Sequence, residues 1–340
     1  MTIDVQPTHG TDRVITLTSE ENIEVDTIAR YLAGRPPRRL DSTAWLATAR
    51  ELSSNLPVRL RQMLRRYTWD AGRDGVLLVR NLPVERDDLP DTPNVAGSVQ
   101  RESTVPAAAQ VLVGLQLGEL IAFREEKSGA LVQDVVPVPG MEAFQGNAGS
   151  VMLSMHVENA FHMYRPDYVG LHCLRNDHDN VAGLQVASIR NALPMLPEAV
   201  RKVLHEPRFF TEPPASFGDL RSAPQPHGIL GGSFDDPDIR IDFESSFPLD
   251  GEAEQAMAVL GDALRSARRT FVLEPGDLAF VDNRLALHGR TEFTPRYDGR
   301  DRWLQRIFVH RDFRRSRELR PEGGHVLGSA GPTHPSAKGD

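Results

Sequence analysis

The chain has 340 residues, of which 40% are hydrophobic and 25% charged, a composition that excludes collagen-like, coiled-coil and largely disordered proteins. With 47 acidic and 39 basic residues the net charge is −8, which excludes a protein that coats nucleic acid without sequence preference. The only cysteine, Cys173, permits no intramolecular disulfide, and we find neither a secretion signal nor the run of about 20 apolar residues that crosses a bilayer. We therefore expect a cytoplasmic protein without membrane or nucleic-acid partners.

The first part of the chain is predicted to be helical. Thr18 and Glu21 are spaced as a capping box, and they precede an apolar stripe at helical spacing formed by Val25, Ile28, Ala29 and Leu32. A second helix is expected over residues 42–52, and Pro57 opens a third. These signals predict a helical N-terminal part at about residues 1–70.

The rest of the chain is predicted to form mainly short strands. Residues 75–82 have the pattern of a buried strand, residues 85–94 that of a loop, and a helix follows near 107–117. From residue 130 on, helical insertions near 197–205 and 252–269 interrupt the strand-like runs ALVQDVV, YVGLHCL, LQVASI, IRIDF, TFVLE, DLAFVD and RWLQRIFV. Many short strands with few helices between them favour an antiparallel sandwich or jelly roll over a parallel sheet. We expect a mainly β fold with flanking helices.

The candidate metal ligands are histidines and carboxylates, because one cysteine cannot build a thiolate site. Two histidines and one carboxylate form the facial triad of non-haem iron(II) oxygenases, often as His-x-Asp/Glu on an extended segment. With 11 histidines, about 1.5 such matches arise by chance, and two occur, at His156-Val157-Glu158 and His310-Arg311-Asp312. His310-Arg311-Asp312 also resembles a kinase catalytic loop but lacks an Asn five residues beyond Asp312, and we interpret His310 as a surface residue. His156 and Glu158 gain support from His288, which follows another predicted strand.

Two arginines follow His288 at a spacing that suggests a common face. Arg302 and Arg306 lie four residues apart in RWLQRIF, so on a strand both guanidinium groups point to the same side. A buried pair of cations needs anionic partners. A dicarboxylate and an amino acid carboxylate would serve, and internal Asp or Glu residues are the alternative.

Three long segments resemble those of a known enzyme family: EKSGALVQDVVPVPGMEAFQGNAGS, HVENAFHMYRPDYVGLHCLR and VDNRLALHGRTEFTPRYDGRDRWLQRIFV. They resemble the clavaminate-synthase-like branch of the iron(II)/2-oxoglutarate oxygenases, and within it the asparagine oxygenases more than the arginine β-hydroxylases. The likeness spans roughly residues 85–330. It implies a single oxygenase domain over residues 1–330 with a double-stranded β-helix, or jelly-roll core, at about 75–320. The tail at 321–340 has almost no apolar residues and is expected to be flexible.

The resemblance also implies an activity. It is the hydroxylation of a free L-amino acid with iron(II), 2-oxoglutarate and O₂, in nonribosomal peptide or other specialised metabolism such as antibiotic biosynthesis. L-asparagine at C3 is the first expectation, and L-arginine or L-lysine at C3 or C4 is the alternative. Glu158 is retained where related halogenases have a small residue, which favours hydroxylation over chlorination.

The resemblance further implies roles for individual residues. His156, Glu158 and His288 match the iron ligands. Arg302 matches the arginine that binds the far carboxylate of 2-oxoglutarate. The positions that match substrate contacts are Arg306 for the carboxylate, Glu126 for the amino group, and Asn147 and Asp242 for the side chain. Without the resemblance, Glu126 and Asn147 would be ordinary turn residues and Asp242 an outward-facing one.

One residue departs from the asparagine-oxygenase pattern. Glu244 lies two residues beyond Asp242, so a strand there would place both carboxylates on one face, as in the arginine-using relatives. A cationic side chain would favour both acids, whereas an amide needs the one acceptor and one donor that Asp242 and Asn147 offer. The sequence therefore leaves the choice of amino acid open, as it does the oligomeric state.

Two other classes of protein were weighed. A jelly roll without chemistry, serving as a binding module, would be signalled by loss of a triad member, and all three members are present. The segment RDFRRSRELR at 311–320 has five arginines that could contact nucleic acid. The acidic chain and the lack of stacking aromatics beyond Phe313 favour a solvated or self-paired segment instead.

Overall fold

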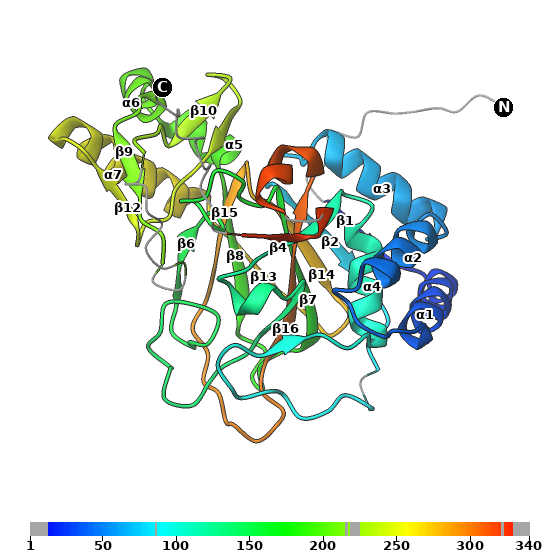
Figure 1. Cartoon of the computed structure of the whole chain (residues 1–340). Coiled ribbons are helices and arrows are strands. Elements are labelled where there is room, and N and C mark those ends of the chain that lie inside the picture. Colours follow the sequence, from blue (N-terminus) through cyan, green and yellow to red (C-terminus); the bar gives the residue numbers. More distant parts are fainter. Residues whose placement is uncertain (1–12, 86, 215–216, 218–224, 321–322, 329–340) are drawn as a thin grey trace, which may run out of the picture.

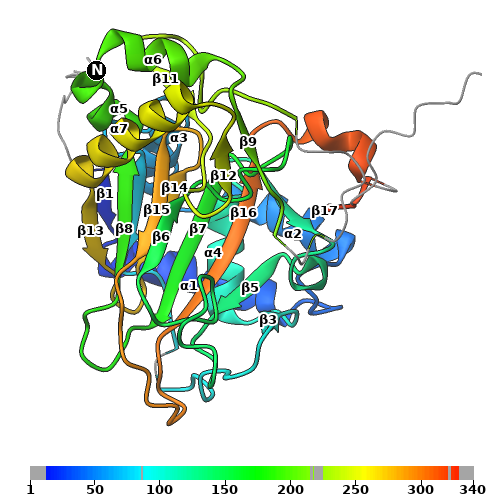
Figure 2. The same cartoon turned by 90° about the vertical axis from the view of Figure 1, so that its left-hand side faces the viewer.

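The computed structural model describes residues 13–85, 87–214, 217, 225–320 and 323–328. Within them, two sheets built mainly from antiparallel pairs pack together (Figure 2). The larger sheet has the order β1-β2-β14-β7-β16-β4-β17, and β5 pairs with both β16 and β3. Its strands are β1 (Val14–Thr16), β2 (Val76–Arg80), β3 (Val99–Gln100), β4 (Glu119–Phe123), β5 (Val132–Val135), β7 (Tyr168–Arg175), β14 (Leu278–Asp282), β16 (Trp303–His310) and β17 (Val326–Leu327).

The smaller sheet carries the order β13-β8-β15-β6. Its strands are β13 (Arg269–Val272), β8 (Gly183–Ser188), β15 (Ala286–Arg290) and β6 (Leu153–His156). Two additional antiparallel pairs lie outside both sheets: β10 (Leu230–Gly232) with β11 (Pro237–Ile239), and β9 (Phe209–Thr211) with β12 (Ser246–Pro248).

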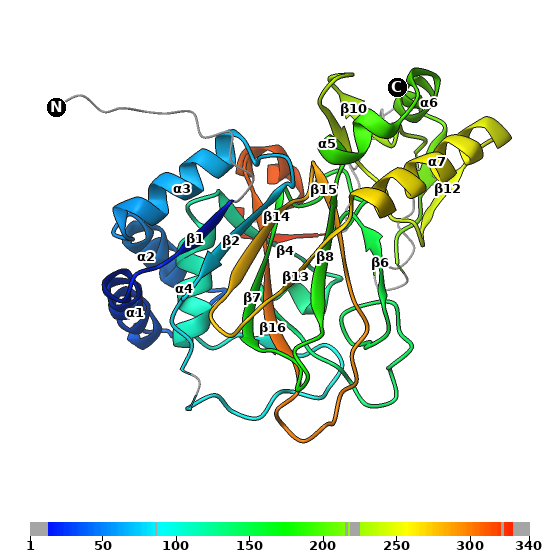
Figure 3. The same cartoon turned by 180° about the vertical axis from the view of Figure 1, so that it is seen from behind.

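Helices cover the outer face of the larger sheet (Figures 1 and 3). They are α1 (Ser19–Gly34), α2 (Thr43–Ser53), α3 (Val58–Trp69) and α4 (Val105–Gly114). The predicted capping box is present, because Thr18 N donates to Glu21 Oε2 and Glu21 N donates to Thr18 Oγ1. The prediction of an all-helical start missed β1, which pairs in parallel with β2. Residues 1–12 lie outside the described part of the chain.

A second group of helices packs at one end of the smaller sheet (Figure 2). It consists of α5 (Ile189–Ala192), α6 (Glu198–His205) and α7 (Gly251–Ala267). Three short 3₁₀ segments complete the described elements: η1 (Lys127–Gly129), η2 (Leu193–Met195) and η4 (Phe313–Leu319). No helix in this part of the chain has the length and apolar character needed to cross a membrane.

Alternation along the strands separates two hydrophobic clusters. In β2, Leu77 and Val79 belong to the cluster under the helices, whereas Val76 and Leu78 belong to the cluster between the sheets. In β15, Ala286 lies in the cluster between the sheets and Leu287 in the other one. Because side chains alternate along a strand, the residues that follow Ala286 at even spacing, including the predicted ligand at 288, face the space between the sheets.

The strand register brings the predicted site together. His288 on β15 pairs directly with His156 on β6. In β16, Leu304 and Phe308 face the space between the sheets, so Arg306 faces it too. The loop from β15 to β16 turns at the lower edge of Figure 2. Because β16 begins at Trp303, Arg302 is the last residue of this loop and Arg306 lies within the strand.

Three predictions about individual segments were wrong. The run IRIDF is not one strand, because β11 ends at Ile239 and only an isolated bridge follows at Asp242. Part of the tail expected to be flexible is held, since β17 pairs with β4 and His325 Nδ1 contacts Leu120 O at 2.6 Å. Residues 329–340 lie outside the described chain. His310 is fully buried rather than on the surface.

The burial of His310 has a local cause. Its Nε2 donates to Tyr164 O at 2.9 Å, and its Nδ1 lies 3.3 Å from Ser316 Oγ in η4, which folds over the end of β16. Burial lowers the pKa of His310 to about 4, so the imidazole is neutral when enclosed. This enclosure depends on how the segment after β16 folds, which the His-x-Asp pattern does not show.

Candidate metal and substrate site

Two histidines and a glutamate from separate segments converge on one point. The rings of His156 and His288 lie 4.5 Å apart between centroids, and Glu158 Oε2 lies 3.5 Å from His288 Nε2. One ligand atom from each residue lies within 4.8 Å of the other two. The structure thus brings together the three residues that the sequence singled out, in a group able to hold a metal ion.

The chemistry of this donor set fits a divalent transition metal. His156 Nδ1 donates to Ser154 O at 2.8 Å, which leaves Nε2 free as a ligand and fixes the ring orientation. Burial, aided by the neighbouring imidazole of His156, lowers the pKa of His288 and favours the neutral form that binds metals. Two neutral imidazoles and one carboxylate suit ferrous iron with positions left for other ligands.

Glu158 is buried but ionised. Burial alone would raise the pKa of this carboxyl, yet the charge of the Arg306 guanidinium and a hydrogen bond from His288 hold the pKa well below its usual range. Arg306 Nη1 donates to Glu158 Oε2 at 2.9 Å. The side chain is therefore a carboxylate at neutral pH, as a metal ligand must be.

A cavity of about 540 Å³ opens beside the three residues. This volume lies within the usual range of small-molecule sites. Seven of the nine predicted site residues line it, and only His288 and Arg302 do not; the seven are Glu126, Asn147, His156, Glu158, Asp242, Glu244 and Arg306.

One wall of the cavity carries an ion pair. Arg306 Nη2 pairs with Glu126 Oε1, while Arg306 Nε donates to Gln133 Oε1 at 3.2 Å and Asn159 Nδ2 donates to Glu126 Oε2 at 3.3 Å. Burial raises the pKa of Glu126, and the charge of Arg306 opposes that rise. A zwitterionic amino acid presents the complementary pair of charges to this wall.

Another wall carries two carboxylates. Asp242 accepts hydrogen bonds from Glu244 N and Ser245 Oγ, both at 2.9 Å, and Glu244 accepts one from Ser154 Oγ. The prediction of a shared strand face was wrong, because residues 243–245 form a turn, yet both acids still reach the cavity. Among the described residues, neither carboxylate pairs with a basic side chain.

Arg302 lies away from the cavity, near the edge of the space between the sheets. It is 5% exposed, and its guanidinium carbon lies 5.7 Å from the centre of the Phe293 ring. Its Nε has no partner in the described chain. Arg290 packs on the same ring at 5.3 Å, and burial together with the charge of Arg302 lowers the pKa of Arg290 to about 9. An anion of suitable shape would relieve this concentration of positive charge.

Sequence reasoning missed three side chains that support the site. Gln133 and Asn159 hold Arg306 and Glu126, and Asn283 binds the backbone of Glu158. A polar residue within the apolar run ALVQDVV could have revealed Gln133. Nothing in the spacing of the chain indicated Asn159 or Asn283, because their partners are set by tertiary structure.

A buried site with two imidazoles and one carboxylate beside a ligand-sized cavity defines a mononuclear non-haem metal enzyme. Residues 47–308 match the family described as taurine catabolism dioxygenase TauD, TfdA family. The chain is 48% identical to the L-asparagine oxygenase of Streptomyces coelicolor over 316 residues, which cover 93% of this chain and 95% of the relative. The chain belongs to the TauD/TfdA family of dioxygenases.

Solved structures agree over nearly the whole chain. An asparagine oxygenase in complex with Fe(II), 2S,3S-3-hydroxyasparagine and succinate matches with a TM-score of 0.90 and 47% identity, covering 94% of this chain and all of the other. The non-haem iron oxygenase OrfP in complex with Fe, succinate and (3S)-hydroxy-L-Arg matches with a TM-score of 0.85 and 30% identity, covering 93% and 99%. The predicted jelly-roll fold and family are confirmed.

Proposed function

We propose that this protein hydroxylates free L-asparagine at C3, using iron(II), 2-oxoglutarate and O₂. The observation that carries the proposal is the convergence of His156, Glu158 and His288 beside a cavity whose wall bears one acid and one base. The similarity to an L-asparagine oxygenase and to a complex with 3-hydroxyasparagine supports the choice of substrate. The clavaminate synthase 2 of Streptomyces clavuligerus, a 34% identical relative, supports a place in specialised metabolism.

His156, Glu158 and His288 would hold the iron. When bound, iron with 2-oxoglutarate and O₂ supplies the oxidant that replaces C–H by C–OH, while 2-oxoglutarate becomes succinate and CO₂. The protein's task is to hold the ion, fix the orientation of one C–H bond and exclude water. Retention of Glu158, which would occupy the place that a halide needs, supports hydroxylation.

Arg302 would bind the far carboxylate of 2-oxoglutarate. Its guanidinium is buried just before β16 begins and has no ion-pair partner in the described chain. A dicarboxylate that reached from the three ligands towards this edge would neutralise it. Such charge-assisted bonds are strong in a site that excludes water.

Glu126 and Arg306 would bind the two ends of the amino acid. The ammonium group would pair with Glu126 and the carboxylate with Arg306, so that the existing ion pair opens and each member gains a new partner. At the other wall, Asn147 and Asp242 would bind the side-chain amide, one as donor and one as acceptor. Contacts at both ends fix the orientation of C3.

A basic amino acid is the second candidate, and one observation favours it. Asp242 and Glu244 both line the cavity, and neither has a cationic partner among the described residues. A guanidinium or ammonium group would neutralise them. Relatives with this chemistry include an L-lysine 3-hydroxylase of Catenulispora acidiphila at 32% identity.

We also propose that the protein acts in the cytoplasm without binding nucleic acid. The single cysteine is consistent with a reducing compartment. In the arginine-rich segment, Arg315 pairs with Asp167, and Arg320 lies over the Phe313 ring. These intramolecular contacts support the prediction of a self-paired segment.

The test is to incubate the purified protein with iron(II), 2-oxoglutarate and each proteinogenic amino acid, and to measure the gain of one oxygen by mass spectrometry. We expect L-asparagine to be converted, and Glu244→Ala to retain that conversion. Conversion of L-arginine or L-lysine alone, lost in Glu244→Ala, would replace asparagine by the second candidate. Absence of turnover with every amino acid would refute the proposal.

A further inference from the structure

A buried side-chain amide holds the backbone of Glu158. The ladder between β6 and β15 ends at His156, so Glu158 lies in the following turn without a strand partner. Glu158 N donates to Asn283 Oδ1 at 2.8 Å, and Asn283 Nδ2 donates to Glu158 O at 3.0 Å and to Pro166 O at 2.9 Å. One planar amide therefore binds both the backbone N–H and the backbone carbonyl of Glu158. It fixes the backbone of this residue as a neighbouring strand would.

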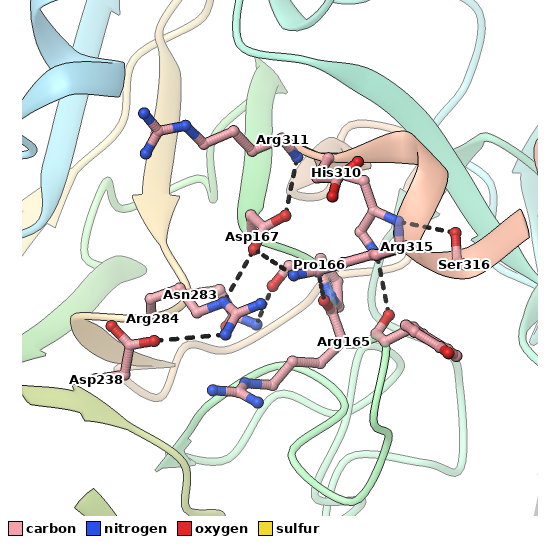
Figure 4. A network of polar contacts seen from close by, with 12 residues as sticks. Arg165, Pro166, Asp167, Asp238, Asn283, Arg284, His310, Arg311, Arg315 and Ser316 are labelled. Carbon is pink, nitrogen blue, oxygen red and sulfur yellow. Dashed lines mark hydrogen bonds and ion pairs between the residues drawn. The ribbon is translucent and has the colours of Figure 1, made fainter. Parts of the chain in front are cut away.

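Asn283 is itself held by a charged network (Figure 4). Its backbone N–H donates to Asp167 O at 2.9 Å. The carboxylate of Asp167 accepts hydrogen bonds from Arg284 Nε at 2.9 Å and Arg311 N at 2.8 Å, and pairs with Arg315 Nη1 at 3.1 Å. Asp167 is 7% exposed, so these charge-assisted contacts lie in a poorly hydrated environment where they are strong.

The arginine-rich segment at 311–320 therefore contacts the loop that follows Glu158. Arg315 Nη2 also donates to Arg165 O at 2.7 Å, one residue before Pro166. Arg314 and Arg317, in the same segment, are exposed. Only some of its arginines thus face the protein, and Arg315 is the one whose guanidinium binds both Asp167 and the loop.

We propose that Asn283, held by Asp167 and Arg315, is a positioning residue for the metal carboxylate Glu158. This inference rests on the proposed function, because it requires that Glu158 bind a metal. His156 and His288 are fixed by direct strand pairing, whereas the backbone of Glu158 is held by this amide. Residues that orient a metal ligand from behind typically change metal affinity about 10- to 100-fold when removed.

The experiment is an anaerobic calorimetric titration of iron(II) into the full-length protein, with thermal melting of each variant beside it. We expect Asn283→Ala to weaken iron binding by about 10- to 100-fold. The matched control is Asn176→Ala, which removes another buried asparagine, one whose side chain binds Asp177 N and Asn180. We expect the control to lower the melting temperature while leaving iron affinity unchanged.

Equal iron affinity in Asn283→Ala and Asn176→Ala would overturn the inference and leave Asn283 with a structural role alone. Arg315→Gln, compared with the exposed Arg314→Gln, provides a second test if Asn283→Ala does not fold. We expect a loss of about threefold or more for Arg315→Gln only, and equal affinities would again contradict the proposal. Failure of the wild-type protein to bind iron would instead overturn the proposed function, and this inference with it.

Discussion

Each end of the space between the sheets contains a buried arginine, and the two arginines have different contacts. At the inner end, Arg306 contacts three acceptor side chains, those of Glu126, Glu158 and Gln133. At the edge, Arg302 has an aromatic neighbour but no carboxylate partner among the described residues, and Arg290 lies on the same ring. An uncompensated buried cation costs several kcal/mol, whereas a paired one is largely compensated.

This difference indicates what each end can bind. At the inner end Arg306 is already paired within the protein, so a ligand that offers both an acid and a base can exchange partners with Glu126 and Arg306. The edge has excess positive charge, so its ligand must be an anion. An amino acid and 2-oxoglutarate meet these two requirements, with the three proposed metal ligands lying next to the inner end.

The largest expected effect is at the proposed metal ligands. Glu158→Ala removes the acidic ligand and leaves Arg306 without one of its buried partners. We expect a loss of more than about 1000-fold in kcat, as when other essential catalytic groups are removed. Product formation would be followed together with succinate release. Normal formation of hydroxylated product by Glu158→Ala would contradict the assigned role.

The next effect distinguishes the two arginines by stability. Arg306→Met breaks buried pairs and leaves Glu126 and Glu158 uncompensated, so we expect the free energy of unfolding to fall by about 3–5 kcal/mol. Chemical denaturation without ligands would measure this free energy.

The less disruptive variant Glu126→Gln keeps the hydrogen-bonding shape of the side chain. We expect it to raise the KM for the amino acid about tenfold or more with little change in kcat. An unchanged KM would exclude Glu126 from substrate binding.

Arg302→Met should have the opposite effect on stability. Replacing an unpaired buried cation by an apolar side chain is expected to raise the free energy of unfolding by about 1–3 kcal/mol. The affinity for 2-oxoglutarate, measured by anaerobic titration, should fall about 100-fold, since truncating one partner of a buried charge pair costs several kcal/mol. Arg175, a partly buried arginine whose hydrogen bonds in the described chain go to carbonyl and hydroxyl oxygens, provides the control Arg175→Met. Equal losses of affinity in both variants would remove the distinction between the two ends.

The smallest expected effect concerns pH. Burial, with the nearby charge of Arg306, lowers the pKa of Lys127 to about 8. Between this pH and the usual lysine range near 10.5 the unfolded chain binds more protons than the folded one, so stability rises with pH in that window. Relative to Lys127→Met, the wild-type protein should gain about 2 kcal/mol in unfolding free energy from pH 8 to pH 10. A constant difference across this range would show that Lys127 is not held in a buried environment.

Some parts of this structure follow from local sequence. The capping box at Thr18 and Glu21 and the alternation in β2 depend on neighbours within a few residues, and both are present. The joining of His156, Glu158 and His288 could be anticipated because strands bring distant histidines into register. Arg302 and Arg306 were expected on one buried face, and the structure buries both.

Other features depend on contacts that no local pattern encodes. The turn at residues 243–245 replaces a strand because Asp242 accepts hydrogen bonds from its own turn. His310 is enclosed by η4, and residues 326–327 pair with the edge of β4. Asn283 binds a backbone that is 125 residues away in the chain. The pairing of β17 and the contact of Asn283 are decided by partners that are remote in sequence. The turn at 243–245 instead depends on local hydrogen bonds that the strand-like run IRIDF does not reveal.

The most direct test of the central claim is the stoichiometry of iron(II) binding in the absence of oxygen. We predict one iron per chain for the wild-type protein and loss of this binding in each of His156→Ala, Glu158→Ala and His288→Ala, with folded variants confirmed by circular dichroism. Retention of one tightly bound iron in any two of these variants would show that the ion is held elsewhere. The assignment of the amino acid to the inner end and of 2-oxoglutarate to the edge would then be wrong as well.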